Sequence, residues 1–126
     1  MKTINLEQLL QIHAIVIHET GGAAGLRDLG RLESALATQT QYVFDTELYE
    51  SFTAKAAALM RAIVADHPFI DGNKRTAMLV GFTFLKINDI SIRILDGVMV
   101  DFAVKIATHK LDVTDVADWL ESFTVR

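Results

Sequence analysis

Cysteine is absent from the chain of 126 residues, and proline occurs once, as Pro68. The absence of thiols excludes disulfide bonds and thiolate metal sites, and it fits a reducing compartment such as the cytoplasm. No stretch approaches the roughly 20 consecutive apolar residues of a membrane-spanning helix, and the first residues lack the apolar core of a signal peptide. We therefore expect a cytoplasmic location and no membrane partner.

Basic side chains are few as well. The 12 lysines and arginines are outnumbered by 16 aspartates and glutamates, which gives a net charge of −4. A general nucleic-acid-binding protein should show a basic surface, so this function is not expected. Apolar residues make up 51% of the chain, enough for a core without disulfide bonds at this length. We expect one domain over residues 1–126.

The apolar residues recur mainly at helical spacing, which predicts an all-α bundle of about six helices. Asn5 and Gln8 have the spacing of a capping box that starts the first helix, and the glycines after Thr20 end it. A β-prone segment at residues 41–45 is typical of a short extended flap. The helices are expected at about residues 6–19, 30–38, 48–66, 73–87, 96–108 and 115–123, the last capped by Thr114.

Residues 67–76 read His-Pro-Phe-Ile-Asp-Gly-Asn-Lys-Arg-Thr and lie between two helical runs. They are expected to form a loop and then a helix N-terminus, whose free N–H groups bind anions. Lys74 and Arg75 add positive charge there, and Gly72 lets the backbone approach a phosphate closely. Asp71 could hold Mg²⁺, and the imidazole of His67 could act as a general base. The pattern predicts a phosphate-transfer site.

Simpler structural roles are open for several of these residues. His67 could be an ordinary histidine at a helix end, and Asp71 or Asn73 could only cap the following helix. Phe69 is expected to be a buried anchor of the loop. Thr76 could either pack inside the helix or contact phosphate. The spacing of the remaining histidines makes no metal cluster, so surface or packing roles are expected for His13, His18 and His109.

The segment resembles the active-site motif of the Fic/Doc (Fido) family, whose general pattern is His-x-Phe-x-Asp/Glu-Gly-Asn-Gly-Arg-x-x-Arg. The matching positions are His67, Phe69, Asp71, Gly72, Asn73 and Arg75. Lys74 replaces the second glycine and Met78 replaces the second arginine. Both departures are similar to the Doc toxins of toxin–antitoxin modules. Residues 25–36 are also similar to the region ahead of the substrate-binding flap in Doc-type chains.

The resemblance implies a Fic/Doc-type helical bundle that uses ATP and Mg²⁺ to modify a hydroxyl group of a target protein. It implies that His67 is the catalytic base and that Asp71 is the metal ligand. The residues expected to bind the nucleotide are Gly72, Asn73, Lys74, Arg75 and Thr76. The flap residues Tyr42, Val43 and Phe44 are candidates for strand-like contact with the target, although they could instead be core residues.

Two reactions are compatible with the motif. Fic enzymes mostly transfer AMP, whereas Doc-like toxins transfer the γ-phosphate of ATP and act as protein kinases. Lys74 and Met78 change where a triphosphate can lie, which favours phosphate transfer. Pro68, Ile70 and Gly72 are nearer to the Fic pattern and keep AMP transfer as the alternative. A second alternative is a non-catalytic module that only binds a nucleotide or a partner.

The resemblance also indicates the partners. The expected target is a threonine of translation elongation factor Tu, whose modification would arrest growth. Many Fic enzymes contain an inhibitory helix with the pattern Ser/Thr-x-x-x-Glu-Gly/Asn. Thr3 with Glu7 and Thr46 with Glu50 have the first spacing, but neither pair is followed by glycine or asparagine. Restraint is therefore expected from a separate Phd-like antitoxin.

Overall fold

The computed structural model describes residues 1–125 and has an all-α fold, which confirms the predicted fold class. Six helices and two short strand pairs make up this part of the chain. None of its helices is long and apolar enough to cross a membrane. The elements follow in the order α1 (Leu6–Thr20), α2 (Leu29–Ala37), the 3-10 turn η1 (Thr38–Thr40), β1 (Tyr42–Val43), β2 (Thr46–Glu47), α3 (Phe52–Asp66), α4 (Asn73–Ile87), β3 (Ser91–Ile92), α5 (Asp96–Thr108), α6 (Val113–Ser122) and β4 (Thr124–Val125).

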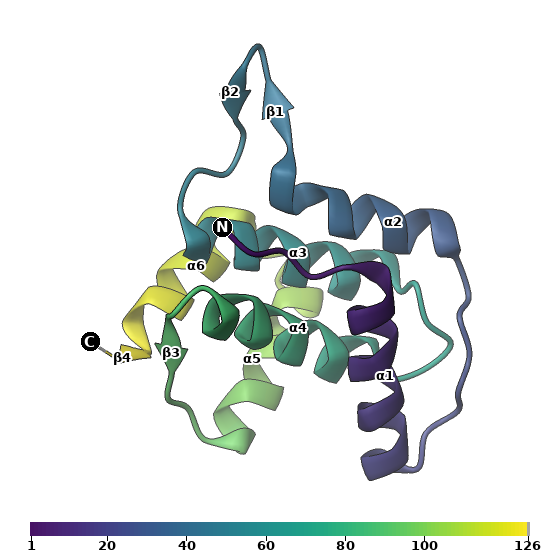
Figure 1. Ribbon diagram of the computed structural model, residues 1–126. Coiled ribbons are helices and arrows are strands. Elements are labelled where there is room, and N and C mark those ends of the chain that lie inside the picture. The colour runs from purple at the N-terminus through teal and green to yellow at the C-terminus, as the bar shows by residue number, and fades with distance from the viewer. Residues whose placement is uncertain (126) are drawn as a thin grey trace.

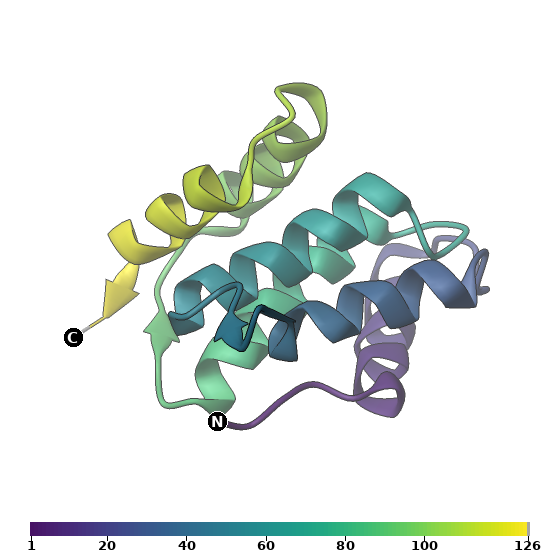
Figure 2. The same ribbon diagram turned by 90° about the horizontal axis from the view of Figure 1, so that it is seen from above.

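Helices α3 and α4 form the centre of the molecule (Figure 1). Consecutive alanines of α3, from Ala56 to Ala58, are buried, and such small side chains let neighbouring helices approach closely. Large buried side chains such as Phe84 of α4 fill the space around them. Seen from above, α5 and α6 lie on one side of this centre and α1 on the other (Figure 2). The connection from α3 to α4 lies near α1, since His13 of α1 bonds to the Asp71 carbonyl in that connection.

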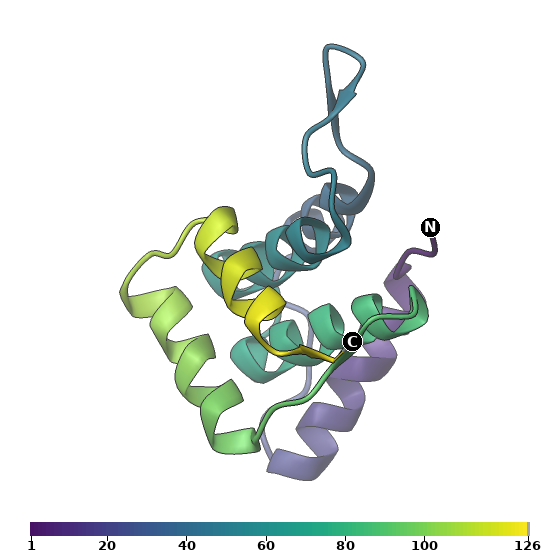
Figure 3. The same ribbon diagram turned by 90° about the vertical axis from the view of Figure 1, so that its left-hand side faces the viewer.

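The segment between η1 and α3 forms an antiparallel hairpin in which Tyr42 pairs with Glu47 and Val43 with Thr46. Its two-residue turn places Phe44 and Asp45 at φ values of 50° and 63°, as hairpins of this length prefer. The hairpin projects clear of the helices (Figure 3). The extended flap is thus present. The alternative that its residues belong to the core is wrong, because Phe44 is 97% exposed.

Two predicted helix starts are wrong. Helix α3 begins at Phe52 rather than near residue 48, because Glu47 is paired in the hairpin and the Ser51 side chain caps the helix. Helix α6 is capped by Asp112 rather than Thr114, in a reciprocal capping box with Asp115. The β3–β4 pair was not predicted. The Asn5 capping box and the start of α4 at Asn73 are confirmed.

Candidate active site

His67 is the residue at which α3 ends and the loop to α4 begins. We call residues 67–72 the motif loop. The His67 backbone has φ 47° and ψ 60°, a left-handed conformation that places it outside the helix, and its side chain is exposed. This conformation costs a residue other than glycine roughly 1–2 kcal/mol. Because such strain persists only where surrounding structure imposes it, the contacts of the loop show what holds His67 in place.

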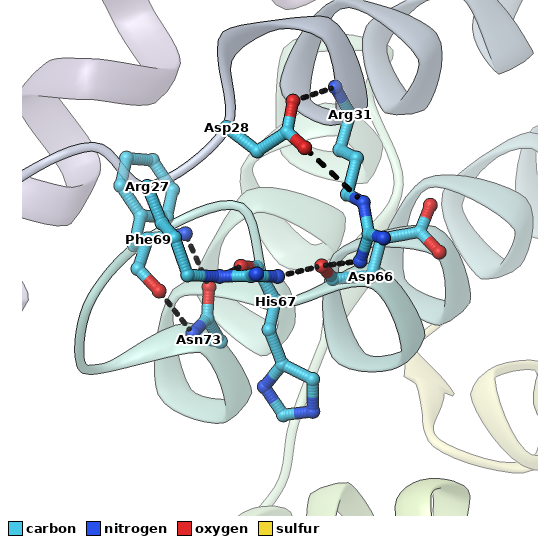
Figure 4. Close-up of polar contacts among 7 residues, drawn as sticks. All are labelled: Arg27, Asp28, Arg31, Asp66, His67, Phe69 and Asn73. Atoms are coloured by element: carbon cyan, nitrogen blue, oxygen red, sulfur yellow. Dashed lines mark hydrogen bonds and ion pairs between the residues drawn. The ribbon is translucent and has the colours of Figure 1, made fainter.

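Two arginines bind the carbonyl groups at the end of α3 (Figure 4). Arg27 donates from Nε to the His67 carbonyl at 2.7 Å and from its terminal nitrogen to the Asp66 carbonyl at 2.6 Å. Arg31 donates to the same Asp66 carbonyl at 2.9 Å and is paired with Asp28. These carbonyls have no partner within the helix, and cations near them also complement the helix dipole. The arginines fix the backbone of His67 while its imidazole points away from them.

The chain before α2 pairs with the motif loop in the manner of a strand. The amides of Arg27 and Asp28 both donate to the Pro68 carbonyl, at 2.7 and 3.0 Å. The amide of Ile70 donates to the Gly25 carbonyl at 3.0 Å. An isolated antiparallel bridge between residues 26 and 69 lies between these bonds. The backbone of the loop is therefore held along its length.

Asn73 and His13 hold the loop from within. The Asn73 amide accepts a hydrogen bond from the Phe69 N–H and donates one to the Phe69 carbonyl, both at 2.9 Å. Phe69 is buried, as expected, and its ring stacks on His13 at 3.7 Å. The His13 ring also bonds to the Asp71 carbonyl through Nε2 at 2.9 Å. Because the Asn73 side chain is engaged with the loop, the geometry gives it a structural role.

The N-terminus of α4 is open to a ligand. Gly72 is its N-cap, with φ 77°, and no side chain caps the helix. The proposed capping roles of the Asp71 and Asn73 side chains are therefore not observed. The first intrahelical bond runs from the Thr76 amide to the Gly72 carbonyl, which leaves the amides of residues 73–75 directed outward. Half-buried Lys74 and Arg75 flank them, an arrangement whose charge suits an anion.

A cavity of about 430 Å³ lies over this helix end, within the size range of small-molecule sites. It brings together most of the predicted site residues with neighbours from α1 and the following turn. Its lining comprises Val16, Thr20, Gly22, His67, Ile70, Asp71, Gly72, Asn73, Lys74 and Arg75. The exposed imidazole of His67, a carboxylate and two cations thus line one cavity.

Asp71 is positioned by backbone amides. Its Oδ1 accepts a hydrogen bond from Gly72 at 2.9 Å, and its Oδ2 accepts one from Ala23 at 3.1 Å. The described residues contain no cluster of three or more His, Cys, Asp or Glu side chains that could hold a metal alone. Mg²⁺ commonly takes one or two protein carboxylates and completes its shell with phosphates and water. A single exposed carboxylate in a cavity that suits a phosphate fits that ion.

Other predicted residues lie elsewhere. Thr76 is fully buried in α4, and its hydroxyl has no hydrogen-bond partner among the described residues. Met78 is fully buried as well, so neither side chain faces the cavity. Residues 42–44 lie beyond the other end of α3, which is about 22 Å long at 15 residues. The structure does not bring the flap to the motif loop.

Sequence reasoning missed the residues that position the loop. His13 was expected only at the surface or in packing, and Arg27 and Arg31 received no role of their own. Their contacts with residues 66–71 join positions 35 to 58 apart in the chain. Local pattern carries no signal for such contacts. The similarity of residues 25–36 to Doc-type chains was the one available indication that this segment matters.

The fold and the site define an all-α protein that presents an uncapped helix N-terminus and two cationic side chains beside an exposed histidine. The chain belongs to the Fic/DOC family, whose model matches residues 3–85. It is 34% identical over 105 residues to a protein named Toxin Doc from Mycolicibacterium smegmatis, covering 82% of this chain and 81% of that one. It is 33% identical over 121 residues to a protein named Protein kinase doc from Escherichia phage P1, covering 95% and 94%.

Proposed function

We propose that this protein is a toxin-type transferase that moves a phosphate from ATP to a hydroxyl group of a target protein. The observation that carries the proposal is the single cavity that combines His67, Asp71, Lys74 and Arg75 with the open N-terminus of α4. The names of its relatives, a toxin and a protein kinase, support both parts of the proposal. A nucleotide-binding module alone would not need the exposed histidine.

The reaction is a proton transfer coupled to displacement at phosphorus. The target hydroxyl oxygen attacks the γ-phosphorus, its proton passes to His67, and the bond from that phosphorus to ADP breaks. Lys74, Arg75 and the amides of residues 73–75 stabilise the charge on the phosphate oxygens. Asp71 is the residue that would hold Mg²⁺, which neutralises phosphate charge when bound. Catalysis of this kind depends mainly on positioning, and the contacts of the motif loop provide it.

Phosphate transfer is favoured over AMP transfer by two positions. Lys74 lines the cavity, where the general Fic pattern has a glycine and hence free space. The general Fic pattern has a second arginine at position 78, but this chain has a buried methionine there. The site therefore lacks that cation. Compared with a site of the general Fic pattern, a triphosphate bound here would meet the added charge and volume of Lys74. It would also lose the contact with the second arginine, because position 78 is methionine. AMP transfer is the second candidate, because the anion site and the base suit attack at either phosphorus.

The partners follow from the same proposal. The target is a threonine of elongation factor Tu in the cytoplasm, and its modification would arrest translation. The hairpin at residues 42–44 is a candidate for contact with the target, since Phe44 at its turn is almost fully exposed. A Phd-like antitoxin would restrain the enzyme. Met78 leaves no partner for an inhibitory glutamate of the Fic type.

The experiment is transfer from labelled ATP to proteins of a cell extract. Purified protein is incubated with ATP labelled at the γ- or the α-position, and His67→Ala serves as the control. A labelled protein band from γ-labelled ATP only, lost in the control, is expected. A band from α-labelled ATP would establish AMP transfer instead. No band under varied metal conditions, with ATP binding intact, would favour the non-catalytic module.

A further inference from the structure

A second cavity, of about 320 Å³, adjoins His67 and is formed by α3, α5 and the turn after α5. Among the described residues, His67 is the one that lines both this cavity and the anion-binding cavity. Its lining comprises Arg61, Val64, Ala65, His67, Ile106, Ala107, Lys110 and Leu111. The imidazole therefore lies between two cavities. In the proposed reaction the anion cavity holds the nucleotide, and the second cavity has no role so far.

The chemistry of the second cavity differs from that of the first. Its floor is apolar, with buried Val64 and Ile106. Its exposed charged side chains are Arg61 and Lys110, and none of the described lining residues is acidic. Arg61 donates from Nε to the Leu111 carbonyl at 2.7 Å, which holds the guanidinium group at the cavity. In a chain with net charge −4, this is a local positive site around an apolar pocket.

We propose that this second cavity is the acceptor subsite, which binds the segment of the target protein that carries the reacting hydroxyl group. An apolar side chain of that segment enters the pocket, and an acidic residue near the hydroxyl pairs with Arg61 and Lys110. The inference rests on the proposed transfer function. It assigns to the target a chemical pattern: a hydroxyl residue flanked by an apolar and an acidic residue.

The position of the base requires an acceptor on this side. A general base must lie about 2.6–3.2 Å from the hydroxyl whose proton it takes. Phosphates held by Lys74 and Arg75 occupy the anion cavity, and the attacking and leaving oxygens lie roughly in line across the phosphorus. The acceptor must then reach His67 from a side that the phosphates leave open. The second cavity adjoins His67, and its lining does not include Lys74 or Arg75. Charge complementarity selects an acidic rather than a basic segment.

The test compares charge reversal inside and outside the cavity. Lys110→Glu changes a lining residue, and Lys105→Glu is the matched control, since Lys105 is exposed on α5 but does not line the cavity. Ala107→Phe fills the cavity without changing charge. Each purified variant is assayed with γ-labelled ATP and limiting cell extract for the initial rate of protein labelling. ATP affinity is measured by calorimetry and folding by thermal unfolding.

The expected result is a loss of about tenfold or more in protein labelling for Lys110→Glu and Ala107→Phe, equal to about 1.4 kcal/mol, with ATP affinity unchanged. Lys105→Glu should label at the wild-type rate. Undiminished labelling by both cavity variants would overturn the subsite, as would an equal loss in the Lys105→Glu control. If the wild-type protein binds ATP but labels nothing, the proposed function fails, and the subsite fails with it.

Discussion

The substitution Gly22→Ala tests whether Asp71 is the Mg²⁺ ligand, and it leaves every charged and proposed catalytic residue unchanged. A Cβ atom at position 22 would lie 2.6 Å from the Asp71 Oδ2 and 3.2 Å from its Cγ. The φ angle of Gly22 lies outside the range that L side chains avoid, so alanine is compatible with the backbone itself. The consequence of Gly22→Ala is therefore displacement of the Asp71 carboxylate.

The size of that displacement follows from the contact distance. Ordinary van der Waals contact begins near 3.4 Å, so the carboxylate oxygen must move by about 0.8 Å. Mg²⁺ requires near-ideal geometry at about 2.0–2.1 Å, and a misplacement of about 1 Å can cost about 100-fold in rate. We expect transfer activity to fall by about 10- to 100-fold at low Mg²⁺. The rate should recover partly as Mg²⁺ is raised.

Stability should hardly change. The variant loses at most the hydrogen bond from Ala23 to Asp71, about 1 kcal/mol, and gains a similar amount from the reduced freedom of the unfolded chain. The assay is the Mg²⁺ dependence of γ-phosphate transfer, with thermal unfolding as the check on folding. Gly97→Ala is the control, since no atom lies within 4 Å of its Cβ position. Wild-type rate and Mg²⁺ dependence in Gly22→Ala would refute the assignment of Asp71 as the metal ligand.

Three further substitutions test the base, the choice of phosphorus and the positioning of the loop. His67→Ala should lower transfer by about 10² to 10⁴ and remove growth arrest while the protein remains folded; arrest at equal expression would contradict its role. Lys74→Gly restores the Asn-Gly-Arg sequence and should abolish phosphate transfer, and unchanged kinase activity would show that Lys74 does not orient the nucleotide. Arg27→Lys keeps the charge but not the two-pronged donor, so kcat should fall about tenfold with little change in the KM for ATP. A rise in KM alone would argue against a positioning role for Arg27.

The parts of the fold that local chemistry determines were predictable from the sequence. The Asn5 capping box places both of its partners within one helical turn, and the α4 start follows directly from Gly72 and the motif. The start of α3 was placed too early, because pairing of Glu47 across the hairpin overrides the helical preference of the residues after it. Asp112 was missed as the α6 cap in favour of the equally plausible Thr114.

In the candidate site, too, the residues within one short segment were predictable from the sequence, and the long-range contacts were not. The sequence indicated His67, Asp71, Lys74 and Arg75, because their chemistry and close spacing are visible in one short segment, and the structure brings them to one cavity. It could not show that Thr76 is turned into the core, since helix orientation depends on packing. Apart from Asn73, the contacts that hold the loop come from residues 13–31, and the tertiary fold alone sets their partners.

The mass that the target gains distinguishes phosphate transfer from AMP transfer. The target protein is treated with wild-type enzyme and ATP, and its intact mass is compared with that of target treated with His67→Ala. We expect a gain of about 80 Da, the mass of one phosphate group, in the wild-type reaction only. A gain of about 329 Da would mean AMP transfer and would contradict the proposed use of the γ-phosphate.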